Sequence, residues 1–194
     1  MNGNLAYQWE PEVEIIGGKL VMLASPTSDH NRTARNIAYL FGHYLRSRTC
    51  EYFPDREALF LEDDTEEYQP DGMVVCDPDK VRHDGVHGAP DLVVEVLSPS
   101  TARYDRGHKM AVYERHGVRE YWIVSPEARS VEQYVLEEGK FVLRDVYTLY
   151  PSFILRHMKE EEIAAIPTQV PCTLFPDLSL PLDEIFYRVA VEKE

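Results

Sequence analysis

One stretch, from Ala89 to Ser125, constrains the fold of this chain more than any other. It holds an apolar run at 92–97, a Ser-Pro-Ser-Thr turn, a helical segment that ends at Gly117, and a second apolar run from Val118. This order predicts a buried strand, a tight turn, a helix that folds back across the sheet, and a second buried strand.

The first apolar run is interrupted by a single carboxylate, Glu95, in Leu-Val-Val-Glu-Val-Leu. Burying a charge inside such a strand is costly unless the charge is paired or bound to a metal ion. Glu95 is therefore a candidate functional residue. Two plainer interpretations stay open, a charge that reaches solvent at the strand end and a structural salt bridge.

A functional carboxylate of this kind needs a partner. Asp91 shares the strand face of Glu95, but four residues of strand separate their backbones by about 13 Å, too far for one metal ion. Asp71 follows Pro70 and opens the strand 72–76, so it is the better partner. Two carboxylates on adjacent strands suit Mg²⁺ or Mn²⁺. The alternative for Asp71 is an ordinary turn residue.

Lys109 supplies the third element of a hydrolytic site. It follows Glu95 by one turn and two helical turns, on the helix expected to cross the sheet. Phosphodiester hydrolysis uses a metal to activate water and a cation to stabilise negative charge on the phosphate. Asp105 lies four residues before Lys109, so a simple surface ion pair is the alternative.

The remaining chain predicts an α+β fold of strands around two helices. Apolar alternation on both sides of Gly17-Gly18 predicts an N-terminal β-hairpin, and Glu138-Gly139 predicts another between 131–136 and 141–149. Helices are expected at 28–48, capped by Ser28 or Asp29, and at 101–116. All 194 residues are expected to form a single domain, in which 151–171 is the segment that no pattern places.

Composition limits the function classes. The net charge is −14, from 34 acidic and 20 basic residues, which weighs against tight, nonspecific binding to long duplexes. No apolar run approaches the about 18 residues of a membrane span, and no signal peptide begins the chain. Three scattered cysteines, Cys50, Cys76 and Cys172, indicate neither a disulfide framework nor a zinc site. We therefore expect a cytoplasmic protein without a membrane partner.

The motifs Pro70-Asp71 and Glu95-Val96-Leu97 resemble the PD-(D/E)xK signature of the restriction-endonuclease-like superfamily. Within it, PDLVVEVLSPST…YDRGHKMAVYERHGVREYWIVSPE closely resembles the Uma-type family of proposed restriction endonucleases, which is abundant in cyanobacteria. The similarity also includes the Gly-Gly hairpin, the helix start from Ser25-Pro26 to His30, and the closing LFPDLSLPLDEIF.

This resemblance implies a restriction-endonuclease-like fold, an α/β sandwich with a mixed central sheet between helices. It implies an endonuclease that uses Mg²⁺ or Mn²⁺ on nucleic acid, DNA more than RNA, with Asp71 and Glu95 as metal ligands. Leu97 stands where the superfamily usually has its lysine, and the resemblance transfers that role to Lys109. His30 is an accessory candidate.

Two further expectations complete this interpretation. A homodimer would suit double-strand cutting. The alternative function is a binding or assembly module that keeps the nuclease fold without turnover, which the acidic balance and Leu97 favour.

Overall fold

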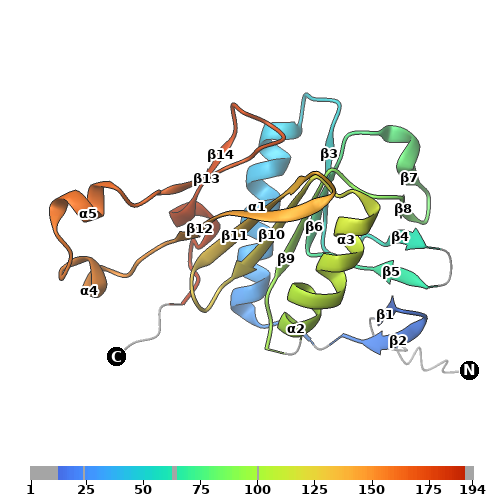
Figure 1. The fold of residues 1–194 in the computed structure, drawn as a ribbon, viewed down its shortest axis with the longest axis horizontal. Coiled ribbons are helices and arrows are strands. Elements are labelled where there is room, and N and C mark those ends of the chain that lie inside the picture. Colours follow the sequence, from blue (N-terminus) through green and yellow to red (C-terminus); the bar gives the residue numbers. More distant parts are fainter. Residues whose placement is uncertain (1–12, 24, 63–64, 100, 191–194) are drawn as a thin grey trace, which may run out of the picture.

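The computed structural model describes residues 13–23, 25–62, 65–99 and 101–190. A six-stranded sheet runs through the middle of the molecule in the order β12-β11-β10-β9-β6-β3 (Figure 1). Its strands are β3 (Glu51–Pro54), β6 (Gly72–Val75), β9 (Leu92–Val96), β10 (Glu120–Ser125), β11 (Ser130–Glu137) and β12 (Lys140–Thr148). Within the described part of this sheet, β9 and β10 pair in parallel and the other neighbours pair antiparallel, so the predicted mixed central sheet is confirmed.

A second six-stranded sheet has the order β2-β1-β5-β4-β8-β7. It contains β1 (Val13–Ile16), β2 (Lys19–Met22), β4 (Leu59–Glu62), β5 (Glu66–Tyr68), β7 (Val81–Arg82) and β8 (Gly85–His87). Strands β1 and β2 form the predicted hairpin, and Gly17 and Gly18 at its turn both have positive φ angles. The sequence did not predict that a separate sheet would form here.

The two predicted long helices are present. The first, α1, spans Ser28–Leu45, and Thr27 caps it by accepting a hydrogen bond from the backbone N–H of His30, at 3.2 Å, in place of the predicted Ser28 or Asp29. The second consists of α2 (Ala102–Tyr104), a π-helical turn η2 (Asp105–Lys109) and α3 (Met110–His116). It ends at Gly117, whose φ of 83° is the left-handed conformation that glycine adopts easily.

Each face of the central sheet has its own hydrophobic core. On one face, α1 and the C-terminal segment cover side chains such as Val94 and Trp122. On the other face, α3 and the second sheet cover Val93 and Ile123. Side chains alternate along a strand, so neighbouring residues of β9 enter different cores. Residue 95 belongs to the face of Val93, beneath α3.

The segment after β12 leaves the body of the molecule as an arm and returns to it (Figure 1). The arm carries α4 (Ser152–Leu155) and α5 (Glu160–Ala164). The returning chain forms the small sheet of β13 (Gln169–Pro171) and β14 (Ser179–Pro181), followed by α6 (Leu182–Ile185).

A 3₁₀ turn, η1 (Pro78–Lys80), precedes β7. None of the helices in the described ranges is long and apolar enough to cross a lipid bilayer.

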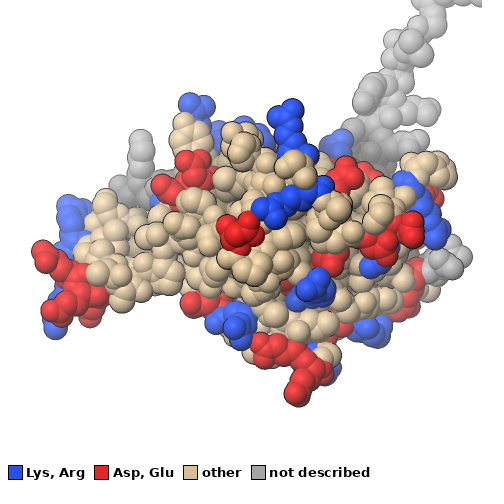
Figure 2. All heavy atoms as spheres, turned by 90° about the horizontal axis from the view of Figure 1, so that it is seen from above, with Lys and Arg blue, Asp and Glu red and all other residues tan. Residues whose placement is uncertain are grey.

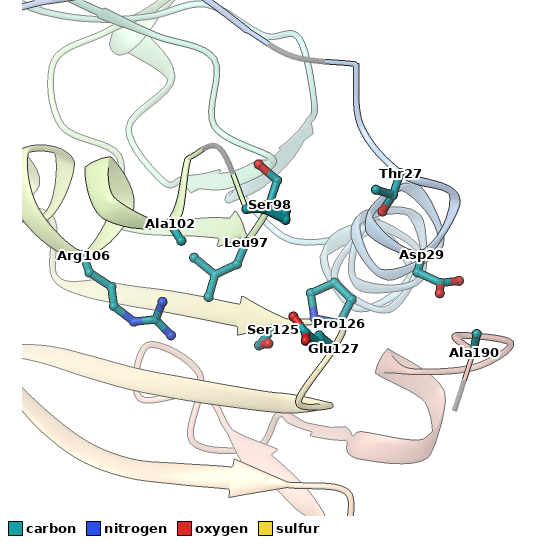
Figure 3. Close-up of a pocket in the computed structure, with 11 residues that line it drawn as sticks. Thr27, Asp29, Leu97, Ser98, Ala102, Arg106, Ser125, Pro126, Glu127 and Ala190 are labelled. Carbon is teal, nitrogen blue, oxygen red and sulfur yellow. The ribbon is translucent and has the colours of Figure 1, made fainter. Parts of the chain in front are cut away.

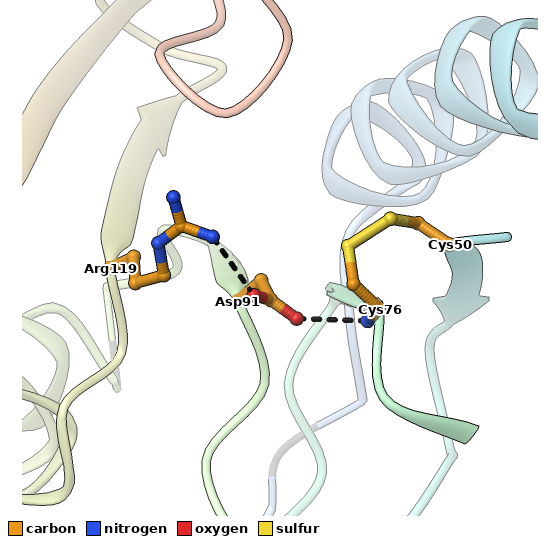
Figure 4. Close-up of a disulfide and its surroundings, with 4 residues drawn as sticks. All are labelled: Cys50, Cys76, Asp91 and Arg119. Atoms are coloured by element: carbon orange, nitrogen blue, oxygen red, sulfur yellow. Dashed lines mark hydrogen bonds and ion pairs between the residues drawn. A yellow bond between two sulfur atoms is a disulfide. The ribbon is translucent and has the colours of Figure 1, made fainter. Parts of the chain in front are cut away.

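A disulfide between Cys50 and Cys76 contradicts the sequence interpretation of the cysteines (Figure 4). Glu51 pairs with Val75 in the ladder of β3 and β6, so the next pair outward is Cys50 and Cys76. The two cysteines are 26 residues apart, and only the strand register brings them together. The backbone N–H of Cys76 also donates to Asp91, at 2.8 Å, which fixes the loop where β9 begins.

Candidate active site

Glu95 lies near the end of β9 with its side chain directed toward α3. It is only 3 % exposed, which excludes a strand-end charge in solvent. Its Oε1 accepts hydrogen bonds from the Tyr113 hydroxyl at 2.8 Å and from the Lys109 ammonium at 3.2 Å. Burial raises the pKa of Glu95 well above its usual value, and the positive charge of Lys109 opposes that rise.

Lys109 is buried, contrary to the alternative of a surface ion pair with Asp105. Its ammonium nitrogen lies 2.9 Å from Glu14 Oε1, 3.2 Å from Glu95 Oε1 and 3.6 Å from Asp105 Oδ1. Burial alone would lower the pKa of this ammonium, but the three carboxylates outweigh burial and raise it. The lysine belongs to the π-helical turn, and such turns occur frequently at functional sites.

Asp71 stands opposite Glu95. Gly72 pairs with Val94 in the antiparallel ladder of β6 and β9. At the next position of the same register, Asp71 lies across from Glu95. The Asp71 carboxylate accepts a hydrogen bond from the backbone N–H of Val96, at 2.7 Å. Asp71 is therefore held beside β9, as the sequence interpretation required of a partner for Glu95.

His30 approaches from the first turn of α1. Its Nε2 lies 3.2 Å from Asp71 Oδ1. Burial lowers the pKa of His30, but the hydrogen bond and the charge of Asp71 outweigh burial, so the pKa lies above its usual value. The accessory candidate thus contacts one of the two predicted metal ligands.

All four predicted site residues line one cavity of about 70 Å³. They come from four separate segments, namely the start of α1, the approach to β6, the end of β9 and the π-helical turn. The other residues that line this cavity are Glu14, Leu23, Pro26, Asp55, Arg56, Gln69, Ser98 and Thr101. The chain therefore brings together acids and a lysine that are widely spaced in the sequence.

Glu14 is the residue that the sequence interpretation missed. It lies in β1, is 1 % exposed, and accepts hydrogen bonds from Lys109 and from the backbone N–H of Gln69, the latter at 3.0 Å. A usable signal was present, because Glu14 stands between Val13 and Ile15 in a short predicted strand. This signal is weaker than the one at Glu95, because alternation of apolar and acidic residues is also typical of a strand with one face in solvent.

The donor set of this cavity fits a hard divalent cation. Asp71 and Glu95 present carboxylates from facing positions, and Mg²⁺ is commonly held by one or two carboxylates while it keeps several waters. No group of three or more His, Cys, Asp or Glu side chains within the described residues is arranged to hold a metal ion. A metal held by Asp71 and Glu95 would complete its shell with water and substrate oxygens.

Comparison with a solved structure identifies the class of fold. A crystal structure from Anabaena variabilis, described as "a putative nuclease belonging to DUF820", superposes with a TM-score of 0.62 and 18% sequence identity. The match covers 91% of this chain and 90% of that chain. The chain thus has an α+β fold shared with that protein, as expected for a restriction-endonuclease-like fold.

Sequence comparison identifies the family. Residues 5–165 match Uma2, described as "Putative restriction endonuclease", and the chain belongs to this family. Two uncharacterized proteins of Synechocystis sp. are relatives. One, slr1290, is 30% identical over 133 residues, which are 66% of this chain and 70% of the relative. The other, sll1609, is 27% identical over 124 residues, which are 62% of this chain and 70% of the relative.

Proposed function

We propose that this chain is a metal-dependent endonuclease that hydrolyses phosphodiester bonds of nucleic acid, DNA more than RNA. The observation that carries the proposal is the convergence of Asp71, Glu95 and Lys109 on one cavity. Membership of the Uma2 family supports the same reaction class. The fold alone would not, because one fold serves many functions.

Each side chain has a role in this proposal. Asp71 and Glu95 would hold Mg²⁺ or Mn²⁺, which supplies Lewis acidity toward the phosphate and lowers the pKa of a bound water. Lys109 is the cation that stabilises negative charge as it develops on the phosphate. Tyr113 fixes Glu95 through its hydroxyl, and His30 fixes Asp71 through Nε2. Such partners hold a ligand in its binding orientation.

The test combines metal binding with cleavage. Calorimetry would measure Mg²⁺ and Mn²⁺ binding to the wild type, Asp71→Ala and Glu95→Ala, and a nuclease assay would use plasmid and single-stranded DNA. We expect both variants to lose metal binding and cleavage together. Asp177→Asn is the matched control, because Asp177 pairs with Arg48 on the surface, outside the cavity. Unchanged metal binding in both variants would contradict the two-carboxylate site.

The alternative function is an inert binding or assembly module. Two observations favour it. Lys109 is already surrounded by three carboxylates. The chain has a net charge of −14, and on the face seen from above in Figure 2 basic and acidic side chains are interspersed. Specific metal binding by the wild type, without cleavage of DNA or RNA, would favour the module over the nuclease.

The predicted homodimer belongs to the same proposal. The Cys50–Cys76 disulfide removes the cysteine argument for a cytoplasmic location, because disulfides persist mainly in oxidising compartments. β12 is an edge strand of the central sheet, and it exposes Val142, Leu143 and Val146 by 40%, 47% and 46%. An exposed apolar edge strand is a surface that a second chain can pair with. Light scattering of the wild type and of Leu143→Lys would test the dimer, since a charge at this edge should yield monomers.

A further inference from the structure

The cavity that holds the predicted site residues is too small for a nucleotide. Its volume is about 70 Å³, whereas pockets for small molecules usually measure about 300–1,000 Å³. It has room for a phosphate group and its immediate ligands. The rest of a nucleic-acid substrate must therefore lie in a hollow that opens into this cavity.

Such a hollow, of about 350 Å³, lies between α1 and the turn at 54–56. It shares four lining residues with the small cavity, namely Pro26, Asp55, Arg56 and Asp71. Its far wall is the exposed side of α1, where Asn31 and Arg35 lie. The two spaces therefore adjoin at Asp71, which faces Glu95.

Arg56 occupies the junction between the two spaces. It lines both of them, and its φ of 76° places a non-glycine residue in the left-handed region. That conformation costs about 1 kcal/mol or more, and residues held in it cluster at functional sites. Arg35 supplies a second guanidinium from α1, where it is exposed and donates to the Asn36 side chain at 3.2 Å.

A second hollow, of about 540 Å³, also touches the small cavity, but its chemistry is less suitable (Figure 3). It shares only Ser98 with that cavity. Its lining has one basic residue, Arg106, against two acids, Asp29 and Glu127. The hollow beside α1 has two arginines, Arg35 and Arg56, against two acids, Asp55 and Asp71. Phosphate binding therefore favours the hollow that contains Arg35 and Arg56.

We propose that the hollow between α1 and the 54–56 turn binds the nucleotide next to the phosphodiester to be cleaved. Arg35 and Arg56 contact the phosphate of that nucleotide, and guanidinium groups suit phosphate because they can donate two parallel hydrogen bonds. This inference rests on the proposed function, since it takes the cleaved phosphodiester to lie beside Asp71 and Glu95.

The experiment measures binding separately from cleavage. A short, fluorescently labelled single-stranded DNA would be titrated with Glu95→Gln protein, which keeps the strand intact, at several salt concentrations. Arg35→Ala and Arg56→Gly would each be added to that background. Arg56→Gly removes the guanidinium and suits the left-handed backbone, and Arg35→Ala lies on an exposed helix face, so both variants should fold.

We expect each variant to weaken binding about fivefold to tenfold. Each should also reduce the slope of log affinity against log salt by about 0.7, the value for one lost phosphate contact on a single strand. Arg188→Gly is the matched control. Arg188 is also an exposed arginine with positive φ, at 61°, but it lines neither space, so affinity and slope should stay unchanged.

The outcomes separate this inference from the proposed function. Unchanged affinity and slope in both arginine variants, with cleavage by the wild type intact, would overturn the inference alone. Failure of the Glu95→Gln protein to bind the strand at all would also overturn it. Absence of cleavage by the wild type would overturn the proposed function, whatever the arginine variants show.

Discussion

Two buried glutamates stand on adjacent strands of the central sheet and face opposite cores. Glu95 on β9 is 3 % exposed, and Glu120 on β10 is 0 % exposed. Glu95 contacts an ammonium and a hydroxyl and lines a cavity. Among the described residues, the donors to Glu120 are neutral: Trp122 Nε1 (2.7 Å), Gln133 Nε2 (2.6 Å), Cys172 Sγ (3.7 Å), Thr173 N (2.9 Å), Thr173 Oγ1 and Leu174 N (3.2 Å).

The difference teaches how to interpret a buried charge. Burial applies equally to both carboxylates, so burial alone does not identify a functional site. Glu120 uses its acceptor capacity to hold the returning C-terminal segment against the sheet, which is a structural task. Glu95 keeps access to a cavity and a charged neighbour, which are properties that chemistry requires.

The largest expected effect comes from neutralising Glu95. Glu95→Gln should reduce the cleavage rate by about 10³-fold, because it removes one of two metal-binding carboxylates. Its unfolding free energy should change by less than about 1 kcal/mol, since Lys109 keeps Glu14 and Asp105 as partners. Initial cleavage rates and urea unfolding of one preparation would measure both. A variant that loses several kcal/mol of stability but cleaves normally would reverse the assignments of the two glutamates.

Neutralising Glu120 should produce the opposite pattern. Glu120→Gln replaces one acceptor oxygen by an NH₂ group, which is itself a donor and would face the N–H and O–H donors that now bond to Glu120. We therefore expect a loss of about 3 kcal/mol of unfolding free energy. Cleavage per folded molecule should stay unchanged. Glu132→Gln is the control, because Glu132 makes partly exposed contacts with Arg106 and Tyr134 and should cost less than about 1 kcal/mol. A stable but inactive Glu120→Gln would show that the two sites are coupled.

A smaller effect is expected at Gly72, next to Asp71. A Cβ at this position would overlap the hydroxyl oxygen and Cζ of Tyr52, whose ring stacks on Phe41 at 5.3 Å. Gly72→Ala should therefore cost about 2 kcal/mol, in the range of overpacked cores, and reduce cleavage by moving Asp71. Combining it with Tyr52→Ala should cost less than the sum of the two single variants. Additive costs would show that Tyr52 does not fix the backbone beside Asp71.

The same comparison explains what the sequence could predict. The apolar run around Glu95 is local, so it predicted both the strand and the unusual carboxylate. Lys109 and Asp71 followed from strand and helix spacing together with the family resemblance. The contact between Glu14 and Lys109 joins residues 95 positions apart and depends on how the second sheet packs, which no local pattern specifies.

Three other features escaped prediction for related reasons. The disulfide depends on the register of β3 against β6, and the register is set only when both strands are placed. The π-helical turn at Asp105–Lys109 has no sequence signature, yet both of its end residues are buried. Besides Trp122 and Gln133, the donors to Glu120 come from residues 172–174, after an arm that the sequence did not place.

The smallest expected effect concerns Cys172, whose sulfur atom lies 3.7 Å from Glu120 Oε2. Burial, and after it the charge of Glu120, raises the pKa of this thiol from 9.0 to about 12. A pKa raised by folding gives stability that is complete below the unfolded value and is lost as pH rises toward the folded value. Between pH 7 and pH 9, the wild type should therefore lose about 0.4 kcal/mol more unfolding free energy than Cys172→Ala, because half of the unfolded thiols ionise at pH 9. Urea unfolding of both proteins at the two pH values would measure the difference. Equal losses would mean that the thiol titrates normally in the folded protein and that water therefore reaches Cys172 and Glu120. The surroundings of Glu120 would then resemble those of Glu95 more than the structure indicates.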